Sequence, residues 1–306
     1  MTGSLFFVQL LNGLQLGILL YLMAAGMTLV LGIMNFISLA HGSLYMMGAY
    51  FGATAYGATG SFVLAGIAGV GGAFALGVFV ERLALVPLYT RDHLDQVLGT
   101  FGLILFFNEL ARIVWGPVPL YMGMPAALSG TVELLGVAYP AYRFVITVAG
   151  LSVAAGLWFL IHRTRLGMLI RAGATNRAMV GALGVDIKLL NTLLFGLSAA
   201  LAGMSGFLVA PILSVQSGMG DYVLVLTLVV IIIGGIGSVR GAFFAALMIG
   251  LVDTFGRLFL PLVLDQFLNA SLSQAAAPAL ASMLIYLLMA FVLAFKPLGL
   301  FPPRSR

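Results

Sequence analysis

The segment GIMNFISLAHGSLYMMGAY, residues 32–50, determines how the rest of the chain is interpreted. It places one Asn, one His and three Gly at the centre of residues 1–80, a stretch that contains no Asp, Glu, Lys or Arg. A membrane span needs about 20 mostly apolar residues, and a polar residue inside one is costly unless it faces protein or water. The segment therefore predicts a polar feature that is buried within a membrane.

Composition extends this interpretation to the whole chain of 306 residues, of which 62% are hydrophobic and 8% charged. These values lie outside the range of soluble domains. We predict an all-α integral membrane protein that forms a single transmembrane domain over residues 1–306. Cysteine is absent, which excludes disulfides and thiolate metal sites. The basic residues behind the net charge of +5 are too sparse to follow a phosphate backbone, so we expect no nucleic-acid partner.

Charge-poor windows bounded by charges, Gly or Pro predict nine membrane helices, with eight or ten as alternatives. Their ranges are 6–32, 36–58, 62–85, 97–116, 142–161, 190–212, 222–238, 241–260 and 278–296.

The basic residues predict an orientation with the N terminus outside and the C terminus in the cytoplasm, because cytoplasmic loops carry an excess of Lys and Arg. Three basic residues fall at outer helix ends: Arg112, Arg143 and Arg257. All the others fall inside: Arg82, Arg91, Arg163, Arg165, Arg171, Arg177, Lys188, Arg240, Lys296, Arg304 and Arg306.

Two loops are long for so compact a chain: an outer loop at 117–141 and an inner loop at 162–189. The inner loop predicts a short helix between a break at Gly173 and a stop at Gly184, with Thr175 as its N-cap. Apolar residues recur in it at helical spacing, at Ala178, Met179, Ala182 and Leu183. Such a helix either contacts anionic lipid at the membrane surface or offers a rigid docking site to a separate motor protein.

The chain carries no sequence pattern of a nucleotide-hydrolysing or metal-dependent enzyme. It lacks the phosphate-binding GxxxxGK[ST] loop, HExxH and GxSxG. Its three histidines, His41, His93 and His162, are far apart in sequence. We therefore expect no catalytic residues, no metal site and no cofactor bound by this chain.

Polar residues in the opening segment are suited to a break between the first two helices. Asn35, Ser38, His41, Gly42 and Ser43 can bond the backbone groups that such a break frees. A polar hairpin that only packs helices together is the alternative. The segment IGGIGSVRGAFFAALMIG at 233–250 has a similar arrangement, so we predict broken helices in two pseudo-repeated halves.

Four stretches of the chain together resemble the Liv-type permeases, the membrane subunits of branched-chain amino-acid ABC importers. They are NGLQLGILLYLMAAGMTLVLGIMNFISLAHGSLYMMGAY at 12–50, RAGATNRAMVGALGVD at 171–186, GGIGSVRGA at 234–242 and KPLGLF at 296–301. The stretches occur in the family's order and extend over nearly the whole chain.

The resemblance implies a permease in a bacterial cytoplasmic membrane that works with a second permease chain, identical or related. It also implies two cytoplasmic ATPases that use ATP and a soluble binding protein that delivers leucine, isoleucine or valine. Permeases for urea and short amides share the pattern, and they remain an alternative. The translocation path would be lined by Asn35, Ser38, His41, Gly42, Tyr45, Gly48, Tyr50, Gly234, Gly235, Gly237, Ser238 and Gly241. The contact with the ATPases would use Arg171, Thr175, Arg177, Ala178, Met179, Ala182, Leu183 and Gly184.

The loop at 171–186 departs from its relatives, because it has Gly-Ala-Thr-Asn-Arg where many of them carry more acidic residues.

A rival interpretation is an ion-coupled transporter, which would need charged residues at mid-membrane. A passive channel is a third interpretation. Each acidic candidate has a structural explanation instead. Glu109 can pair with Arg112 and Asp253 with Arg257, Glu81 stands beside Arg82 at an inner helix end, and Asp221 stands at a helix start.

Overall fold

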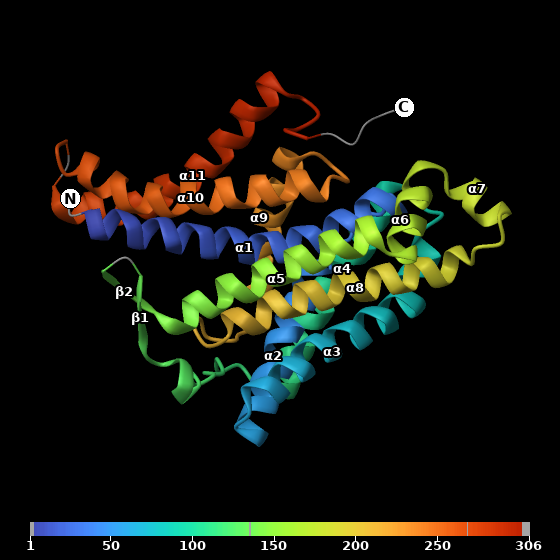
Figure 1. The fold of residues 1–306 in the computed structure, drawn as a ribbon, viewed down its shortest axis with the longest axis horizontal. Coiled ribbons are helices and arrows are strands. Elements are labelled where there is room, and N and C mark those ends of the chain that lie inside the picture. Colours follow the sequence, from blue (N-terminus) through green and yellow to red (C-terminus); the bar gives the residue numbers. More distant parts are fainter. Residues whose placement is uncertain (1–2, 135, 268, 302–306) are drawn as a thin grey trace. The chain divides into compact units, whose positions relative to one another are not determined.

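The structure is a computed structural model, which describes residues 3–134, 136–267 and 269–301 and is mainly helical (Figure 1). Arg304 and Arg306, two of the basic residues assigned to the inner side, lie outside the described residues. The nine long helices are α1 (Gly3–Met34), α2 (His41–Thr59), α3 (Phe62–Val80), α4 (His93–Trp115), α5 (Ala141–Arg163), α8 (Ile187–Val209), α9 (Met219–Gly234), α10 (Val239–Leu264) and α11 (Ala270–Phe295). The short elements are a π-helical turn η1 (Glu81–Leu85), the 3-10 turns η2 (Val86–Leu88) and η3 (Ala126–Leu128), the strands β1 (Thr131–Leu134) and β2 (Val137–Pro140), and the helices α6 (Arg165–Thr175) and α7 (Arg177–Ala182).

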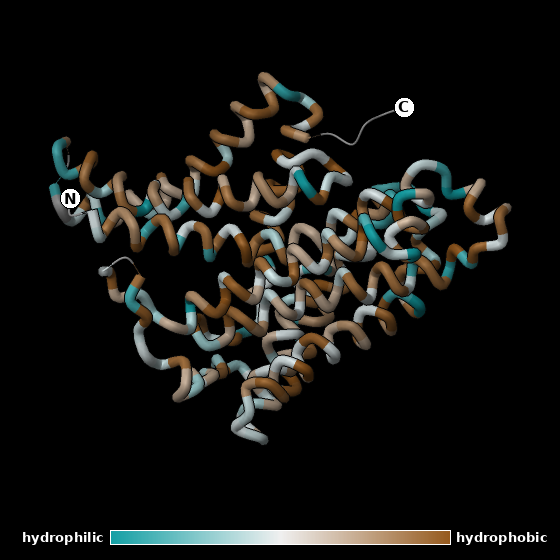
Figure 2. Tube along the Cα trace, viewed as in Figure 1, coloured by the Kyte–Doolittle hydropathy of each residue, from teal (hydrophilic) through white to brown (hydrophobic). Residues whose placement is uncertain are grey.

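Each of the nine predicted ranges contains a helix among the described residues, and the all-α membrane fold is confirmed. Seven helices in the described part of the chain are long and apolar enough to cross a bilayer: α1, α3 with its continuation to Leu88, α4, α5, α8, α10 and α11. The other two predicted helices are α9, which is apolar but has only 16 residues, and α2. Figure 2 shows the apolar residues running along the helices, whereas hydrophilic residues gather around α6 and α7.

Several helix ends differ from the prediction because local hydrogen bonds decide where a helix begins. The second helix begins at His41 and not at residue 36, since residues 35–40 leave the helical conformation. Helix α8 begins three residues early, where the Asp186 carboxylate accepts from the N–H groups of Lys188 and Leu189. The last helix was predicted to begin at Pro278. It begins at Ala270, so Pro278 lies inside α11.

The outer loop contains a hairpin that the sequence did not predict. Strands β1 and β2 pair in antiparallel fashion, with Thr131 opposite Pro140 and Leu134 opposite Val137. Gly136 in the connection has a φ of +78°, a conformation that suits glycine.

The inner loop forms two helices where one was predicted. Gly173 lies inside α6 and does not break it, and Thr175 is the last residue of that helix. The N-cap of α7 is Asn176, whose side-chain oxygen accepts from Met179 N–H at 3.0 Å, so the prediction of Thr175 was wrong by one residue. Gly184, with a φ of +86°, follows the end of α7 as predicted.

The chain forms two compact units. Unit 1 contains Met1–Tyr21, Ala126–Leu151 and Thr227–Arg306, and unit 2 contains Leu22–Pro125 and Ser152–Leu226. Helices α1, α5 and α9 therefore each begin in one unit and end in the other.

In unit 2, α2, α3 and α8 pack closely against one another, and small residues allow this approach. A Cβ atom on Gly48 of α2 would lie 2.6 Å from the carbonyl oxygen of Gly203 in α8. Gly206 lies against the carbonyl of Tyr45 in the same way. The three helices consequently meet backbone to backbone, and most of α2 is buried.

In unit 1, the start of α1 packs against α10 through Gly13, Gly17 and Gly250, and α10 also packs against α11. Asp253 and Arg257 form an ion pair of 2.9 Å within α10, and Arg257 also reaches Ser282 of α11 at 3.5 Å. The pair therefore helps to hold two helices together.

The backbone contact between α2 and α8 predicts the outcome of a single added methyl group. We expect Gly48→Ala to destabilise the protein by about 1–3 kcal/mol, because overpacking forces two backbones apart. The fall should be visible as a lower Tm of the detergent-solubilised protein. Gly71→Ala on α3 is the matched control, since a Cβ there meets nothing within 4 Å. Equal melting temperatures for both variants would contradict the proposed contact.

Candidate functional site

The first break, residues 35–40, separates α1 from α2. Asn35 has a φ of +50°, the left-handed conformation that Asn adopts more readily than most residues. Its N–H still donates to the carbonyl of Leu31 at 3.2 Å. The N–H of Leu39 donates to the hydroxyl oxygen of Thr100 in α4 at 3.2 Å. The break is therefore a fixed conformation, with backbone groups bonded by the helix before it and by α4.

Asn35 is exposed, whereas Ser38 in the first break and His41 and Ser43 at the start of α2 are buried. His41 is 1% exposed, and its Nε2 lies 3.2 Å from the carbonyl oxygen of Met23 in α1, so this bond requires the proton on Nε2. The hydroxyls of Ser38 and Ser43 are buried and have no hydrogen-bond partner among the described residues. Buried polar groups are normally bonded. The Ser38 and Ser43 hydroxyls therefore differ from most buried polar groups.

The other predicted path residues on α2 make packing contacts within unit 2. A Cβ on Gly42 would lie 2.8 Å from the carbonyl oxygen of Gly220, and Gly48 meets α8 as described above. Tyr45 and Tyr50 are buried, and the Tyr50 ring centroid lies 4.7 Å from that of Trp115. These four residues position α2, which agrees with the packing alternative for this part of the segment.

The second break, residues 235–238, separates α9 from α10. Gly235 and Gly237 have φ values of +102° and +83°, which favour glycine. Gly234 and Gly241, on either side of the break, touch through their backbones. The Ser238 hydroxyl accepts from the N–H of Gly241 at 3.1 Å and so caps α10. The predicted residues are therefore brought together in a tight helix-to-helix turn.

A segment that we had not assigned to the site completes the second break. The N–H of Leu300 donates to the carbonyl of Ile233 at 2.8 Å, and the N–H of Phe301 donates to that of Gly234 at 3.1 Å. Gly299 lies directly against Gly235. The last carbonyls of a helix lack partners within the helix. Residues 299–301 supply partners from a distant part of the chain, a pairing for which the sequence has no local signal.

The predicted ATPase contact forms a small projection beyond the start of α8 (Figure 1). Arg171 donates to the carbonyl of Ile161, and the Thr175 hydroxyl donates to the carbonyl of Arg171 at 3.0 Å, so both predicted residues are engaged with backbone groups of the chain itself. Helix α7 buries Val180 and exposes four predicted residues, Ala178, Met179, Ala182 and Leu183. Arg177 is half-buried.

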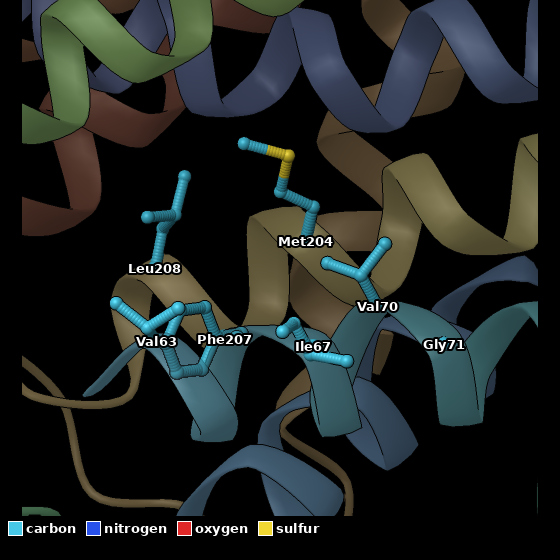
Figure 3. A pocket seen from close by; sticks show the side chains of 8 residues that line it. Val63, Ile67, Val70, Gly71, Met204, Phe207 and Leu208 are labelled. Atoms are coloured by element: carbon cyan, nitrogen blue, oxygen red, sulfur yellow. The ribbon is translucent and has the colours of Figure 1, made fainter. Parts of the chain in front are cut away.

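An open groove of about 500 Å³ lies between α3 and α8 in unit 2 (Figure 3). Its lining is apolar, with Val63, Ile67, Val70, Met204, Phe207 and Leu208 among the residues. A site for a charged or polar solute needs a few placed polar groups. The groove lacks them and is suited to a lipid chain or an apolar helix face.

The four acidic residues that the sequence explained structurally lie where that explanation placed them. Glu109 pairs with Arg112 at 3.0 Å and Asp253 pairs with Arg257. Asp221, in the first turn of α9, accepts from Asn108 at 3.3 Å. Glu81 lies at the end of α3, as expected. The sequence did not predict that Glu81 is buried and that its carboxylate accepts from the hydroxyls of Tyr89 and Thr192.

Comparison with known proteins assigns the chain to a family. Residues 9–293 match the family described as "Branched-chain amino acid transport system / permease component". The chain belongs to this permease family. The match includes both breaks and α7, and it ends before residues 299–301. Together with the seven apolar helices, it makes the chain a multi-pass membrane protein and a transport permease component.

Individual permeases of known name are similar over most of their length. A high-affinity branched-chain amino acid transport system permease protein of Pseudomonas aeruginosa, BraD, is 30% identical over 81% of this chain and 85% of its own. The corresponding protein LivH of Escherichia coli K12 is 27% identical over 83% and 87%. The ribose import permease protein RbsC of Escherichia coli K12 is 28% identical over 80% and 76%. No solved structure matches the chain.

The left-handed residue of the first break provides a test of its conformation. We expect Asn35→Gly to leave the Tm unchanged or raise it slightly, because glycine adopts a positive φ at no steric cost. Asn35→Val should destabilise by about 1–2 kcal/mol, the cost of that conformation for a residue with a Cβ. Ile37→Val, within the same break, is the control for small apolar changes. A Tm for Asn35→Val that matches the control would refute the conformation described for this break.

Proposed function

We propose that this chain is one permease subunit of an ATP-driven importer for branched-chain amino acids. The observation that carries the proposal is the family match over residues 9–293, supported by relatives that are named as branched-chain amino acid permeases. The importer would consist of this chain, a second identical or related permease chain, two ATP-hydrolysing subunits and a soluble binding protein. ATP would be used by those partner subunits, with no cofactor held by this chain.

In this proposal the chain resides in a bacterial cytoplasmic membrane, with the N terminus outside and the C terminus inside. The excess of basic residues on the inner side supports this orientation. Helices α6 and α7 then project into the cytoplasm, where the ATPases act.

The exposed apolar face of α7 supports a docking role for the projection. Met179 is 57% exposed and Leu183 is 76% exposed, although both follow a basic, polar segment. Apolar anchors on a rigid helix commonly contribute most of the binding energy at protein interfaces. Movement of the ATPases would reach the membrane through α7 and open the path alternately to the two sides.

The chemistry of the first break supports an amino acid as the substrate. The N-terminal end of α2 carries a partial positive charge, which favours a carboxylate, and the Ser38 and Ser43 hydroxyls are free to bond polar atoms. A zwitterion with an apolar side chain needs no fixed counter-ion at such a site. In this proposal, residues 35–50 and 234–241 line one path.

Urea or a short amide is the alternative substrate class, because permeases for such solutes share the sequence pattern. The similarity to a ribose import permease shows that relatives at comparable identity are named for unrelated solutes. An ion-coupled transporter or a channel would need no ATPase, and partner identification separates these classes from the importer.

The proposal is tested by purifying the tagged chain from its native membrane in mild detergent and identifying the proteins that accompany it. We expect an ATPase with a GxxxxGK[ST] loop and, where the complex is a heterodimer, a second permease. Reconstituted into vesicles with the binding protein, the complex should import labelled leucine only with ATP. Excess unlabelled isoleucine or valine should compete, and urea should not.

Recovery of the chain without an ATPase, under conditions that keep a control importer intact, would overturn the importer and favour an ion-coupled transporter or channel. Competition by urea or acetamide, and none by isoleucine, would retain the importer and change its substrate class.

The docking role of α7 has its own test. We expect the double variant Met179→Asp, Leu183→Asp to lower ATPase recovery about tenfold or more. Replacing apolar anchors that the interface would bury by charged residues should weaken the binding free energy by more than about 1.4 kcal/mol. Met168→Asp on α6 is the matched control, since Met168 is 55% exposed and lies outside α7. Equal ATPase recovery from both would favour the lipid-contacting interpretation of the inner loop.

A further inference from the structure

A buried carboxylate lies in unit 2 that neither break nor α7 explains. Glu81 is 1% exposed and forms no ion pair with any described residue. One carboxylate oxygen accepts from the Tyr89 hydroxyl at 2.8 Å, and the other accepts from the Thr192 hydroxyl at 2.9 Å. A buried carboxylate without hydrogen-bond donors is strongly unfavourable. The Tyr89 and Thr192 hydroxyls therefore stabilise the buried Glu81 carboxylate.

The two donors come from separate segments of unit 2. Glu81 opens the π-helical turn η1, which continues α3, and π-helical turns occur frequently at functional sites. Tyr89 follows the 3-10 turn η2, and Thr192 lies in the second turn of α8. The carboxylate consequently ties the segment after α3 to the start of α8.

From Tyr89 the contacts continue to the first break. The Tyr89 ring packs edge-on against Phe36, with ring centroids 5.1 Å apart and an interplanar angle of 81°. Phe36 is buried and directly follows Asn35, the residue with positive φ. Gln96 of α4 donates to the carbonyls of Leu88 and Arg91, which holds the backbone on both sides of Tyr89.

The chain itself links Thr192 to α7, through the first turn of α8 and the short segment 183–186. The N–H of Val185 donates to the carbonyl of Val180 in α7, and Asp186, the next residue, caps α8. Burial of Tyr89, and next its hydrogen bond to Glu81, raise the pKa of its hydroxyl, so the hydroxyl stays protonated and remains a donor. The charge of Arg177 in α7 lowers that pKa by a smaller amount.

We propose that Glu81 is a positioning residue that makes the α7–α8 junction and the first break move as one body, an inference that rests on the proposed function. If α8 moved without the segment that carries Tyr89, the carboxylate would lose one of its two donors inside the protein. That arrangement resists relative movement, so displacement of α7 by an ATPase is passed on to residues 35–40. The chain's proposed gate and its proposed docking helix are linked through this one carboxylate.

The test measures how tightly ATP hydrolysis is coupled to leucine import, and not only the stability of the protein. Tyr89→Phe keeps the ring on Phe36 and removes one donor, and Thr192→Val keeps the shape and removes the other. We expect each variant to assemble with the ATPase and to lower the leucine imported per ATP hydrolysed at least threefold in the reconstituted complex. Tyr56→Phe, a half-buried tyrosine elsewhere on α2, should keep the wild-type ratio. Wild-type ratios for both Tyr89→Phe and Thr192→Val would overturn the proposal.

A double-mutant cycle shows whether Glu81 and Tyr89 act as a unit. Glu81→Gln should lower the ratio to the same extent as Tyr89→Phe, and the combined variant should be no worse than either single one. Additive losses would mean independent local effects and would also overturn the proposal.

A distance measurement keeps the test valid if leucine is not the substrate. The chain has no cysteine, so spin labels can be placed at Arg91→Cys and Lys188→Cys, both exposed positions outside the predicted ATPase contact, without background labelling. In the purified protein with its co-purifying subunits we expect one narrow distance distribution, which Tyr89→Phe or Thr192→Val broadens and Tyr56→Phe leaves unchanged. An unchanged distribution in the first two variants refutes the link. Absence of ATP-driven import by the wild type refutes the proposed function alone.

Discussion

The obligation to bond every backbone N–H and C=O inside an apolar protein governs this structure. A continuous helix meets that obligation by itself, and an interrupted helix does not. The described part of the chain has two breaks between apolar helices, and at each break another part of the same unit bonds some of the freed backbone groups. The Thr100 hydroxyl of α4 accepts from the N–H of Leu39 at the first break, and the N–H groups of Leu300 and Phe301 donate to carbonyls at the second. Distant segments of the chain therefore help to support both irregular segments.

The apolar environment of a membrane also favours close packing of helix backbones. Helices in a bilayer gain little from burying apolar side chains, and small residues that allow dense contact take over. Gly42, Gly48 and Gly203 allow such contacts in unit 2, and Gly13, Gly17 and Gly250 allow them in unit 1. The glycines of unit 2 explain how most of α2 can be buried although it is among the less apolar of the long helices.

The sequence was sufficient for the main features that depend on local pattern. Nine helices, the positions of both breaks and the stop at Gly184 follow from apolar length, from Gly and from capping chemistry. Features that depend on distant partners were missed. No local signal shows that Phe301 bonds Gly234, or that Thr192 and Tyr89 meet at Glu81. The N-cap of α7 was missed for another reason: Thr175 and Asn176 are both good caps, and only the geometry of the turn selects Asn176. The hairpin at 131–140 is four residues per strand, too short to stand out from a Pro- and Gly-rich loop.

The pairing of residues 299–301 with the second break has a consequence for biosynthesis. A chain is made from its N terminus, so Ile233 and Gly234 leave the ribosome long before their hydrogen-bond donors exist. Throughout the synthesis of α10 and α11 the carbonyls at the end of α9 must be bonded by water or lipid headgroups. The second break therefore acquires its native hydrogen bonds late, after α11 has been inserted. Until then, the turn between α9 and α10 lacks the bonds from residues 300 and 301.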